Sequence, residues 1–304
     1  MEIVADSLAR RDWDRLAPAA AMQQAWAYGE ACAALGSRIL RLEIRRGRET
    51  LGLAQVVHRR LLGCLDAFVC TRGPIWLHAE DADTRANALR MLRKSMQGGR
   101  LKGFFTTPDH CAQGVPTLRA AGLARVMTPY CTARLDITRP EAEIRARMHQ
   151  KWRNRLVVAE KAGFRVTRAD RRAEAFQWLL EEETQQQSAK RYNALPPALV
   201  TAWHQANGDM RVLTAERDGR PEAAMLFLVH GTQATYHMGW TSAAGRADSA
   251  HNLLLWQGIR KLKAAGVATL DLGGLNTEDI PGIARFKLGT GAELRTLCGT
   301  WFGR

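Results

Sequence analysis

The sequence predicts an α/β protein built from two similar domains, and three observations support this fold class. The chain has 304 residues, more than one ordinary domain holds and enough for two domains of about 150 residues. Strands and helices occur in the same order twice along the chain. A strongly basic segment lies between the two halves. The composition, with 46% hydrophobic and 24% charged residues, is typical of globular proteins and excludes a disordered or collagen-like chain.

Each half begins with a predicted hairpin of two strands, because apolar and polar residues alternate on both sides of a turn. The strands are expected at residues 39–44 and 51–57 in the first half and at residues 211–216 and 223–229 in the second. In the second hairpin the turn contains the Asp218-Gly219 pair, which is a strong signal for a tight connection between antiparallel strands.

Each hairpin is followed by a predicted helix and then by another strand. The helices are expected at residues 86–96 and 252–265, and the strands at residues 101–106 and 267–272. Gly98-Gly99 and Gly266 follow the helices, where glycine supplies the left-handed conformation that ends a helix. The hairpin glycines Gly47 and Gly219 are 172 residues apart, and Gly99 and Gly266 are 167 apart. This nearly constant offset predicts a duplicated domain.

The basic segment, residues 139–172, holds eleven of the 44 Lys and Arg residues and only four acidic ones. One helix is expected over residues 141–162, because Pro140 suits its start and Gly163 its end. Its apolar stripe consists of Ile144, Met148, Trp152, Leu156 and Ala159. Its cationic residues, which we predict to contact phosphates, are Arg147, Lys151, Arg153 and Arg155. Cations spaced four apart repel one another unless an anion compensates, although a solvated helix face remains the alternative.

The net charge of +14 favours anionic partners such as nucleic acid, phosphorylated ligands or membrane surfaces. A surface that serves only solubility is the other interpretation. The six cysteines form no C-x-x-C pair and are expected to be buried free thiols. The sequence has no H-E-x-x-H, G-x-S-x-G or phosphate-loop motif, so metal, hydrolase and nucleotide-triphosphatase sites are not supported.

The location expected from the sequence is the cytoplasm. The first residues are partly acidic and form no apolar stretch of signal-peptide length. The longest apolar runs, such as residues 223–229, are far shorter than the roughly 20 residues that a membrane span requires. Membrane insertion is therefore not expected.

Several short motifs occur in a fixed order from about residue 20 onward. They are Gln24-Ala-Trp26-Ala-Tyr28, Arg72-Gly73-Pro74, the segment from Met148 to Val166, Tyr236-His-Met-Gly-Trp240-Thr-Ser242, Asp271-Leu-Gly-Gly274 and Gly282-Ile-Ala-Arg-Phe286-Lys287. In combination they resemble the FemABX-like aminoacyltransferases, which transfer an amino acid from aminoacyl-tRNA to an amine of a peptidoglycan precursor. The segment after Met148 is also similar to BioF2-like acyltransferases, some of which are thought to use acyl-CoA.

The resemblance implies two tandem GNAT-like domains, each a mixed, mostly antiparallel sheet flanked by helices. It places an N-terminal domain at residues 1–138, a basic connecting helix at 139–165 and a C-terminal domain at 166–304. It further implies aminoacyl-tRNA as co-substrate, an amine-bearing acceptor and no bound cofactor or metal. The absence of a long coiled-coil insertion after the middle helix resembles the shorter, FemX-type members.

The sequence departs from the family's pattern in two places. Thr107-Pro108-Asp109 stands where FemX-like members carry an Asp-Pro, and residues 183–187 lack an arginine that the family commonly places there. In the family these positions touch the nucleotide-sugar substrate. The identity of the acceptor amine therefore stays open.

Transfer from an ester needs no nucleophilic side chain, because the ester is already reactive; it needs positioning and stabilisation of the developing oxyanion. By the match to the family's closing motifs, the resemblance implies that Lys287, Phe286 and Asp271 are catalytic. Without it, Lys287 would be interpreted as an ordinary surface lysine. Asp271 ends an apolar strand and is costly to bury unpaired, so it is expected to anchor the loop or to pair with Lys287 or Arg285.

Six further residues are candidates for substrate binding: Arg72, Lys190, Arg191, Tyr192, Tyr236 and Trp240. The cationic ones suit phosphate contacts. Tyr236 and Trp240 are an even number of residues apart in a predicted strand and should face the same side, either in the core or as a ligand platform.

Two alternative functions remain open at this stage. One is an acyl-CoA-dependent N-acyltransferase of the same fold, although residues 242–250 match poorly to the Q/R-x-x-G-x-G/A turn that binds a pyrophosphate at a helix start. The other is a non-catalytic module that binds tRNA or another nucleic acid.

Overall fold

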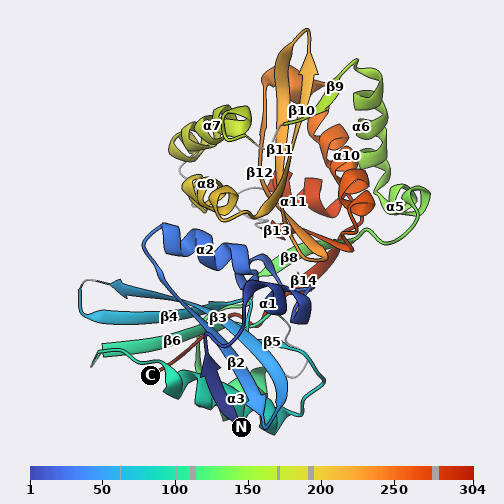
Figure 1. Cartoon of the computed structure of the whole chain (residues 1–304). Helices are drawn as coiled ribbons and strands as arrows, with labels where there is room; N and C mark the ends of the chain where they lie inside the picture. Colours follow the sequence, from blue (N-terminus) through green and yellow to red (C-terminus); the bar gives the residue numbers. More distant parts are fainter. Residues whose placement is uncertain (62, 100, 110–113, 170–171, 191–194, 276–280) are drawn as a thin grey trace. The chain divides into compact units, whose positions relative to one another are not determined.

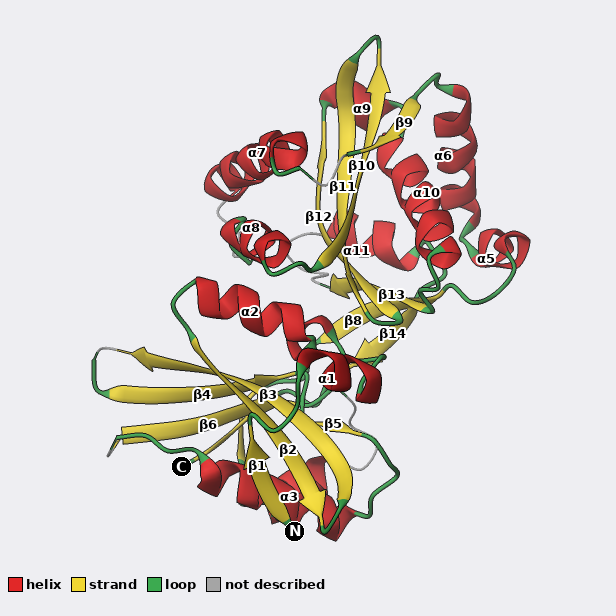
Figure 2. Ribbon diagram, viewed as in Figure 1, coloured by secondary structure: helices red, strands yellow, loops and turns green. Residues whose placement is uncertain are grey.

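The computed structural model describes the chain except for residues 62, 100, 110–113, 170–171, 191–194 and 276–280 (Figure 1). It divides into two compact units. Unit 1 comprises residues 1–131 and 296–304, and unit 2 comprises residues 132–295. Each unit has its own sheet, with helices packed on it (Figure 2). The predicted duplication of an α/β domain is confirmed.

The sheet of unit 1 has the strand order β1-β2-β3-β4-β6-β15-β7, and β5 pairs with β3 beside this path. Among the described residues only β4 and β6 pair in parallel. The elements are β1 (Glu2–Ala5), α1 (Arg10–Leu16), the 3-10 helix η1 (Met22–Gln24), α2 (Trp26–Ala34), β2 (Arg38–Arg46), β3 (Glu49–Leu61), β4 (Leu65–Thr71), β5 (Ile75–Trp76), α3 (Ala82–Ser95), β6 (Leu101–Thr107), α4 (Gly114–Ala120), β7 (Ala124–Met127) and β15 (Thr300–Gly303).

The sheet of unit 2 has the order β14-β8-β13-β12-β11-β10-β9, with β12 and β13 parallel. Helices α6 and α10 cover one face, and α7 and α8 lie on the other (Figure 2). The elements are β8 (Cys131–Asp136), α5 (Glu141–Arg147), α6 (Gln150–Lys161), β9 (Arg165–Arg168), α7 (Glu174–Lys190), α8 (Ala198–Gln205), β10 (Asp209–Arg217), β11 (Arg220–His230), β12 (Gln233–Thr241), α9 (Ala243–Ala247), α10 (Ala250–Ala264), β13 (Thr269–Gly274), α11 (Pro281–Leu288) and β14 (Glu293–Thr296).

The glycines after the two long helices differ in their roles. Gly266 has φ 82° and ends α10 in the predicted left-handed conformation. The same prediction is wrong for Gly98 and Gly99, because neither has a positive φ. They instead allow the backbone to approach β4: the Gly99 N–H donates to Asp66 Oδ2 at 2.6 Å, and a Cβ on Gly98 would lie 3.1 Å from the Asp66 side chain.

The single helix predicted over residues 141–162 is two helices, α5 and α6. Met148 and His149 are extended between them, with ψ near 145°. The break is stabilised because the His149 N–H donates to Gly289 O at 2.9 Å, and Arg153 donates to the Ala146 and Met148 carbonyls. The predicted apolar stripe is nevertheless buried throughout. Arg147 and Lys151 therefore belong to different helices, and the predicted continuous row of cations is wrong.

Two strands do not follow the boundaries expected at residues 138 and 165. β8 lies between β13 and β14 in the sheet of unit 2. β15 lies between β6 and β7 in the sheet of unit 1, where Trp301 is buried in the core. The chain thus passes from one unit to the other twice, near residues 131 and 295. Helices α5 and α6 are part of unit 2 rather than a separate connection.

Five cysteines are described, and all five are free thiols. Cys32, Cys70 and Cys298 are buried as expected, whereas Cys64 is exposed and Cys131 is partly exposed. Cys111 lies outside the described residues. None of the described helices has the length and apolarity that crossing a bilayer requires.

Candidate functional site

The candidate site of unit 2 lies where its parallel strands part. β12 and β13 pair in three rows, from Gln233 with Thr269 to Thr235 with Asp271. β12 then continues to Thr241 and β13 to Gly274 without further rows between them. Backbone groups and side chains at such an opening can face a ligand. Asp271, Tyr236 and Lys287 all lie at this end of the strand pair.

Lys287 lies on α11, near its C-terminal end. Its Nζ donates to Gly274 O, the last residue of β13, at 2.8 Å. Burial lowers the pKa of Lys287 to about 8, because desolvation disfavours the cation, and the negative charge of Asp271 opposes this shift. A partly desolvated ammonium therefore lies at the end of the strand, beside a backbone carbonyl.

Asp271 is buried, with 6% exposure, and anchors the loop as expected. Its Oδ1 accepts from the Gly273 N–H at 2.7 Å. Its Oδ2 lies 3.7 Å from Arg134 Nε, across the antiparallel rows of β8 and β13, an ion pair that the sequence did not predict. Sequence reasoning missed Arg134. The available signal was a single arginine between buried residues of a short strand.

Phe286 is held by the basic segment. The Trp152 indole N–H donates to Phe286 O at 3.1 Å, and the two rings lie 6.0 Å apart. Trp152 is a core residue, as expected, with 5% exposure. Gly289 allows this contact, because a Cβ there would lie 2.7 Å from the Trp152 ring. The start of α6 thus fixes the backbone immediately before Lys287.

A β-bulge in β12 changes the direction of its side chains. Leu226 is paired with Met238 and Phe227 with Tyr236, so that His237 is the extra residue. An extra residue reverses the alternation of side chains along a strand. Burial lowers the pKa of His237 to about 4, so its imidazole is neutral at pH 7.

Tyr236 and Trp240 consequently face opposite sides of the sheet, and the prediction of a shared face is wrong. The Tyr236 ring lies 5.9 Å from that of Phe227, within the core under α10. The Trp240 ring lies 5.5 Å from that of Trp178 on α7, on the other face. The two aromatic residues do not form one platform.

The Tyr236 hydroxyl lies close to the backbone of its own strand. A Cβ on Gly239 would overlap the hydroxyl oxygen, so glycine is required for this arrangement. Burial raises the pKa of Tyr236, and the nearby charge of Glu183 raises it further. Tyr236 is therefore a neutral hydrogen-bonding group at physiological pH.

The four predicted phosphate-binding residues differ in their surroundings. Arg153 is engaged with backbone carbonyls at the α5–α6 break. Arg147 lies 4.0 Å from Glu293. Lys151 and Arg155 lie four residues apart on α6 and are exposed. Within the described part of the chain, the side chains of Lys151 and Arg155 make no hydrogen bond or ion pair.

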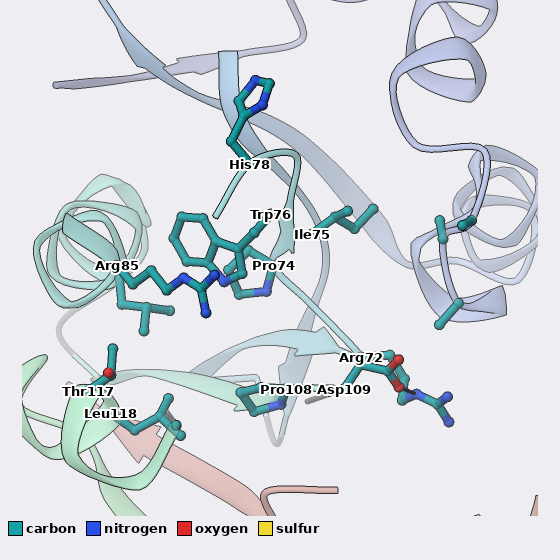
Figure 3. A pocket seen from close by; sticks show the side chains of 15 residues that line it. Arg72, Pro74, Ile75, Trp76, His78, Arg85, Pro108, Asp109, Thr117 and Leu118 are labelled. Carbon is teal, nitrogen blue, oxygen red and sulfur yellow. Dashed lines mark ion pairs between the residues drawn. The ribbon is translucent and has the colours of Figure 1, made fainter. Parts of the chain in front are cut away.

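Arg72 lies in unit 1, directly after β4, whereas Lys287 lies in unit 2. It is 6% exposed, has φ 60° and pairs with Asp109. Both residues line a cavity of about 450 Å³, at the opposite end from Trp76 and Arg85 (Figure 3). Lys190 ends α7, and Arg191 and Tyr192 lie outside the described residues.

The stretch from β12 to α10 contains a short capped helix and a carboxylate, where a cofactor pyrophosphate would bind in the alternative function. Ser242 accepts from the Gly245 N–H at 2.9 Å and caps the short helix α9. Asp248, two residues before α10, pairs with Arg217 at 2.7 Å. A carboxylate at this place disfavours a pyrophosphate at the start of the helix.

Known proteins share this architecture. Residues 145–291 match the family described as acetyltransferase (GNAT) domain. The crystal structure of FemX is similar over 99% of this chain and 97% of its own, with a TM-score of 0.84 and 16% identity. This chain has the FemX-like tandem GNAT fold. The family resemblance stated from the sequence is therefore confirmed at the level of the fold.

Two further solved structures are similar to this FemX-like protein. A tandem GNAT protein from the clavulanic acid biosynthesis pathway has a TM-score of 0.55 and 13% identity, over 99% of this chain and 98% of its own. L-PGS from Bacillus licheniformis has a TM-score of 0.51 and 11% identity, over 83% and 81%. No curated protein matches in sequence. The GNAT match, which includes β12, α10 and Lys287, supports an acyltransferase.

Proposed function

We propose that this FemX-like protein transfers an aminoacyl group from aminoacyl-tRNA to an amine acceptor at the opening between β12 and β13. The observation that carries the proposal is the partly desolvated Lys287 ammonium at 2.8 Å from Gly274 O. Its backbone is fixed by Trp152 through Phe286 O. A positioned cation in a site of low polarity is the device that acyl transfer requires.

The reaction forms one bond and breaks one. The acceptor nitrogen attacks the ester carbonyl carbon, whose oxygen becomes an oxyanion beside the Lys287 ammonium. The tetrahedral intermediate then collapses, and the bond to the ribose oxygen breaks. The nitrogen loses a proton and the ribose oxygen gains one, so that the products are an amide and deacylated tRNA. No covalent enzyme intermediate is needed, because the ester is already activated.

The lowered pKa of Lys287 suits this role. With a pKa of about 8, about ten lysines are cationic for each neutral one at pH 7. Partial desolvation strengthens the interaction of that cation with a developing negative charge. The site thus keeps the cation at physiological pH and removes part of its hydration beforehand.

Features of unit 2 support tRNA over acyl-CoA as donor. Lys151 and Arg155 present two exposed cations on α6, which can contact a phosphate backbone. The carboxylate of Asp248 next to the start of α10 disfavours a cofactor pyrophosphate there. The acceptor is an amine of a peptidoglycan precursor or of another peptide or small molecule. Aminoacyl-tRNA acts as co-substrate, and no bound cofactor or metal is included in the proposal.

The experiment incubates the purified protein with charged tRNAs and a panel of amines, and follows loss of the ester and appearance of the amide. We expect loss of the ester that depends on the amine for at least one tRNA. Deacylation equal to the enzyme-free control for all twenty charged tRNAs would contradict the proposal. A parallel series with acyl-CoA esters tests the alternative donor. Tight tRNA binding without any amide product would instead indicate a binding module.

A further inference from the structure

All residues that line the cavity of about 450 Å³ belong to unit 1, whereas the residues proposed for acyl transfer belong to unit 2. Its size is within the range of small-molecule sites. Its walls come from segments distant in sequence: β5 contributes Trp76, α3 contributes Arg85 and Leu89, and α4 contributes Thr117 and Leu118. Figure 3 shows Arg85 beside the Trp76 ring, with Thr117 and Leu118 below them.

Arg85 is an uncompensated cation in this wall. Its side chain is partly buried, and its Nε is fully buried without a hydrogen-bond partner. Among the described residues, no carboxylate or carbonyl pairs with its guanidinium. Its position is on the apolar stripe of α3, four residues before Leu89 and seven before Leu92, which are both buried. A buried N–H donor without a hydrogen-bond partner is costly.

The surroundings of Arg85 define what would satisfy it. The guanidinium carbon lies 5.5 Å from the centre of the Trp76 ring, which orients the side chain by a cation–π contact but supplies no hydrogen bond. Leu89 and Leu118 provide apolar walls. A planar guanidinium presents donors in a fork that fits the oxygens of a carboxylate or phosphate. The cavity therefore offers one anion position next to an apolar chamber.

At the other end of the cavity the cation already has a counterion. There Arg72 is already paired with Asp109, and Pro74 and Pro108 lie between that pair and Arg85 (Figure 3). A ligand anion at the Arg72 end would have to compete with the carboxylate of Asp109. The anion position is thus at the Arg85 end.

We propose that this cavity binds a small ligand that has an oxyanion group, held by Arg85, on a flat or branched apolar body that packs against Trp76, Leu89 and Leu118. The oxyanion is a carboxylate or a phosphate. The cavity shares no lining residue with the residues proposed for acyl transfer, and its ligand binding does not depend on the chemistry proposed there.

Three probes with the same ring test the proposal by titration calorimetry on the full chain: 1-naphthoate, 1-naphthyl phosphate and the neutral 1-naphthamide. We expect at least one anion to bind with a stoichiometry of one and at least tenfold more tightly than the amide. The tighter anion indicates whether the natural ligand carries a carboxylate or a phosphate. Binding of neither anion at millimolar concentration, or equal binding of the amide, would overturn the proposal.

Variants locate the site. Arg85→Gln should weaken anion binding at least tenfold and leave amide binding unchanged, because a charge-assisted hydrogen bond is lost. Arg90→Gln, an exposed arginine on the same helix, removes the same charge and should have no effect. Equal affinities of these two variants would contradict the proposal.

A measurement on the unmodified chain covers the case in which Arg85→Gln does not fold. The indole N–H resonance of Trp76, assigned with Trp76→Phe, should shift on saturation with the anion in the wild-type protein. An unshifted Trp76 resonance at saturation would place the probe elsewhere and overturn the assignment.

Discussion

Among the described residues, units 1 and 2 each contain one parallel strand pair, and the two pairs differ in length. In unit 1, β4 and β6 remain paired over seven rows, from Leu65 with Leu101 to Thr71 with Thr107. In unit 2, β12 and β13 pair over only three rows. A short helix follows the second strand of each pair: α4 in unit 1 and α11 in unit 2.

The side chains at the two openings account for the different chemistry. In unit 1, α4 contributes Thr117 and Leu118 to a cavity in which the cation beside them, Arg85, comes from another helix. In unit 2, α11 itself contributes the cation Lys287, which bonds to the end of β13. The same order of elements thus forms a cavity in unit 1, whereas in unit 2 it positions the ammonium of Lys287.

The largest expected effect concerns β15, the strand of unit 1 that follows unit 2 in the sequence. Trp301→Ala removes a side chain that is 1% exposed, and should lower the free energy of unfolding of unit 1 by about 3–5 kcal/mol. Hydrogen exchange followed by mass spectrometry should show faster exchange in residues 1–131 but not in 132–295. Trp203→Ala, at a fully buried position in unit 2, is the matched control and should give the reverse pattern. An equal change in both units would contradict the independence of the two cores.

The next effect concerns Lys287, the cation of the proposed transfer site. Lys287→Met should lower the turnover of aminoacyl transfer by about 100-fold, because removing one oxyanion-stabilising group typically costs this much. The control Lys261→Met makes the same substitution at an exposed position on α10 and should retain wild-type turnover. Ester loss under single-turnover conditions measures both. Wild-type turnover in Lys287→Met, with the fold intact, would exclude Lys287 from the mechanism.

The two units should respond to pH in the same direction, but in different pH windows. In unit 1, hydrogen bonds from Gly99 N–H and His58 to the carboxylate of Asp66 lower its pKa to about 2. Asp66 therefore binds fewer protons in the folded state than in the unfolded state between pH 2 and its ordinary pKa of 3.8. The stability that it contributes is lost as the pH falls through this window. Asp66→Asn should flatten the acid dependence, as measured by denaturant unfolding at several pH values.

In unit 2, the lowered pKa of Lys287 acts in the same direction, but at alkaline pH. Between pH 8 and the ordinary pKa of 10.5, the unfolded state binds more protons than the folded state, so the stability contribution rises with pH. Lys287→Met should remove this rise. An unchanged slope in this variant would contradict the desolvation of Lys287.

The smallest effect concerns the α6 cations. Lys151→Ala and Arg155→Ala should each reduce the slope of log affinity for tRNA against log salt concentration by about 1, because each removes one phosphate contact. Arg153→Ala, whose side chain is engaged with backbone carbonyls, should leave the slope unchanged. Filter-binding titrations between low and physiological salt measure the slopes. Equal slopes in all three variants would remove α6 from the tRNA contact.

Local signals in the sequence predicted most of the fold. The Asp218-Gly219 turn forms with both residues at positive φ, as the hairpin pattern requires. The apolar spacing from Ile144 to Ala159 correctly predicted the buried face. These features depend on a few neighbouring residues, so a short stretch of sequence contains the information.

The features that were not predicted depend on distant partners. No glycine or proline marks the break at Met148, which is stabilised by Gly289, about 140 residues later. The bulge at His237 depends on the register with β11. The sequence analysis did not single out Arg85 as a ligand-binding candidate, because that role depends on the cavity around it. A charged residue in the apolar stripe of α3 was nevertheless a visible signal.

The path of the chain through β15 has a consequence for biosynthesis. Leu297 N–H donates to Tyr130 O at 3.0 Å, which joins the two segments that lead into and out of unit 2. On the ribosome, residues 132–295 are complete before the strand that lies between β6 and β7 has been made. Until β15 has been made, the nascent unit 1 keeps two unpaired strand edges, and such edges invite aggregation. The half that is translated first therefore cannot complete its sheet until the end of the chain has been made.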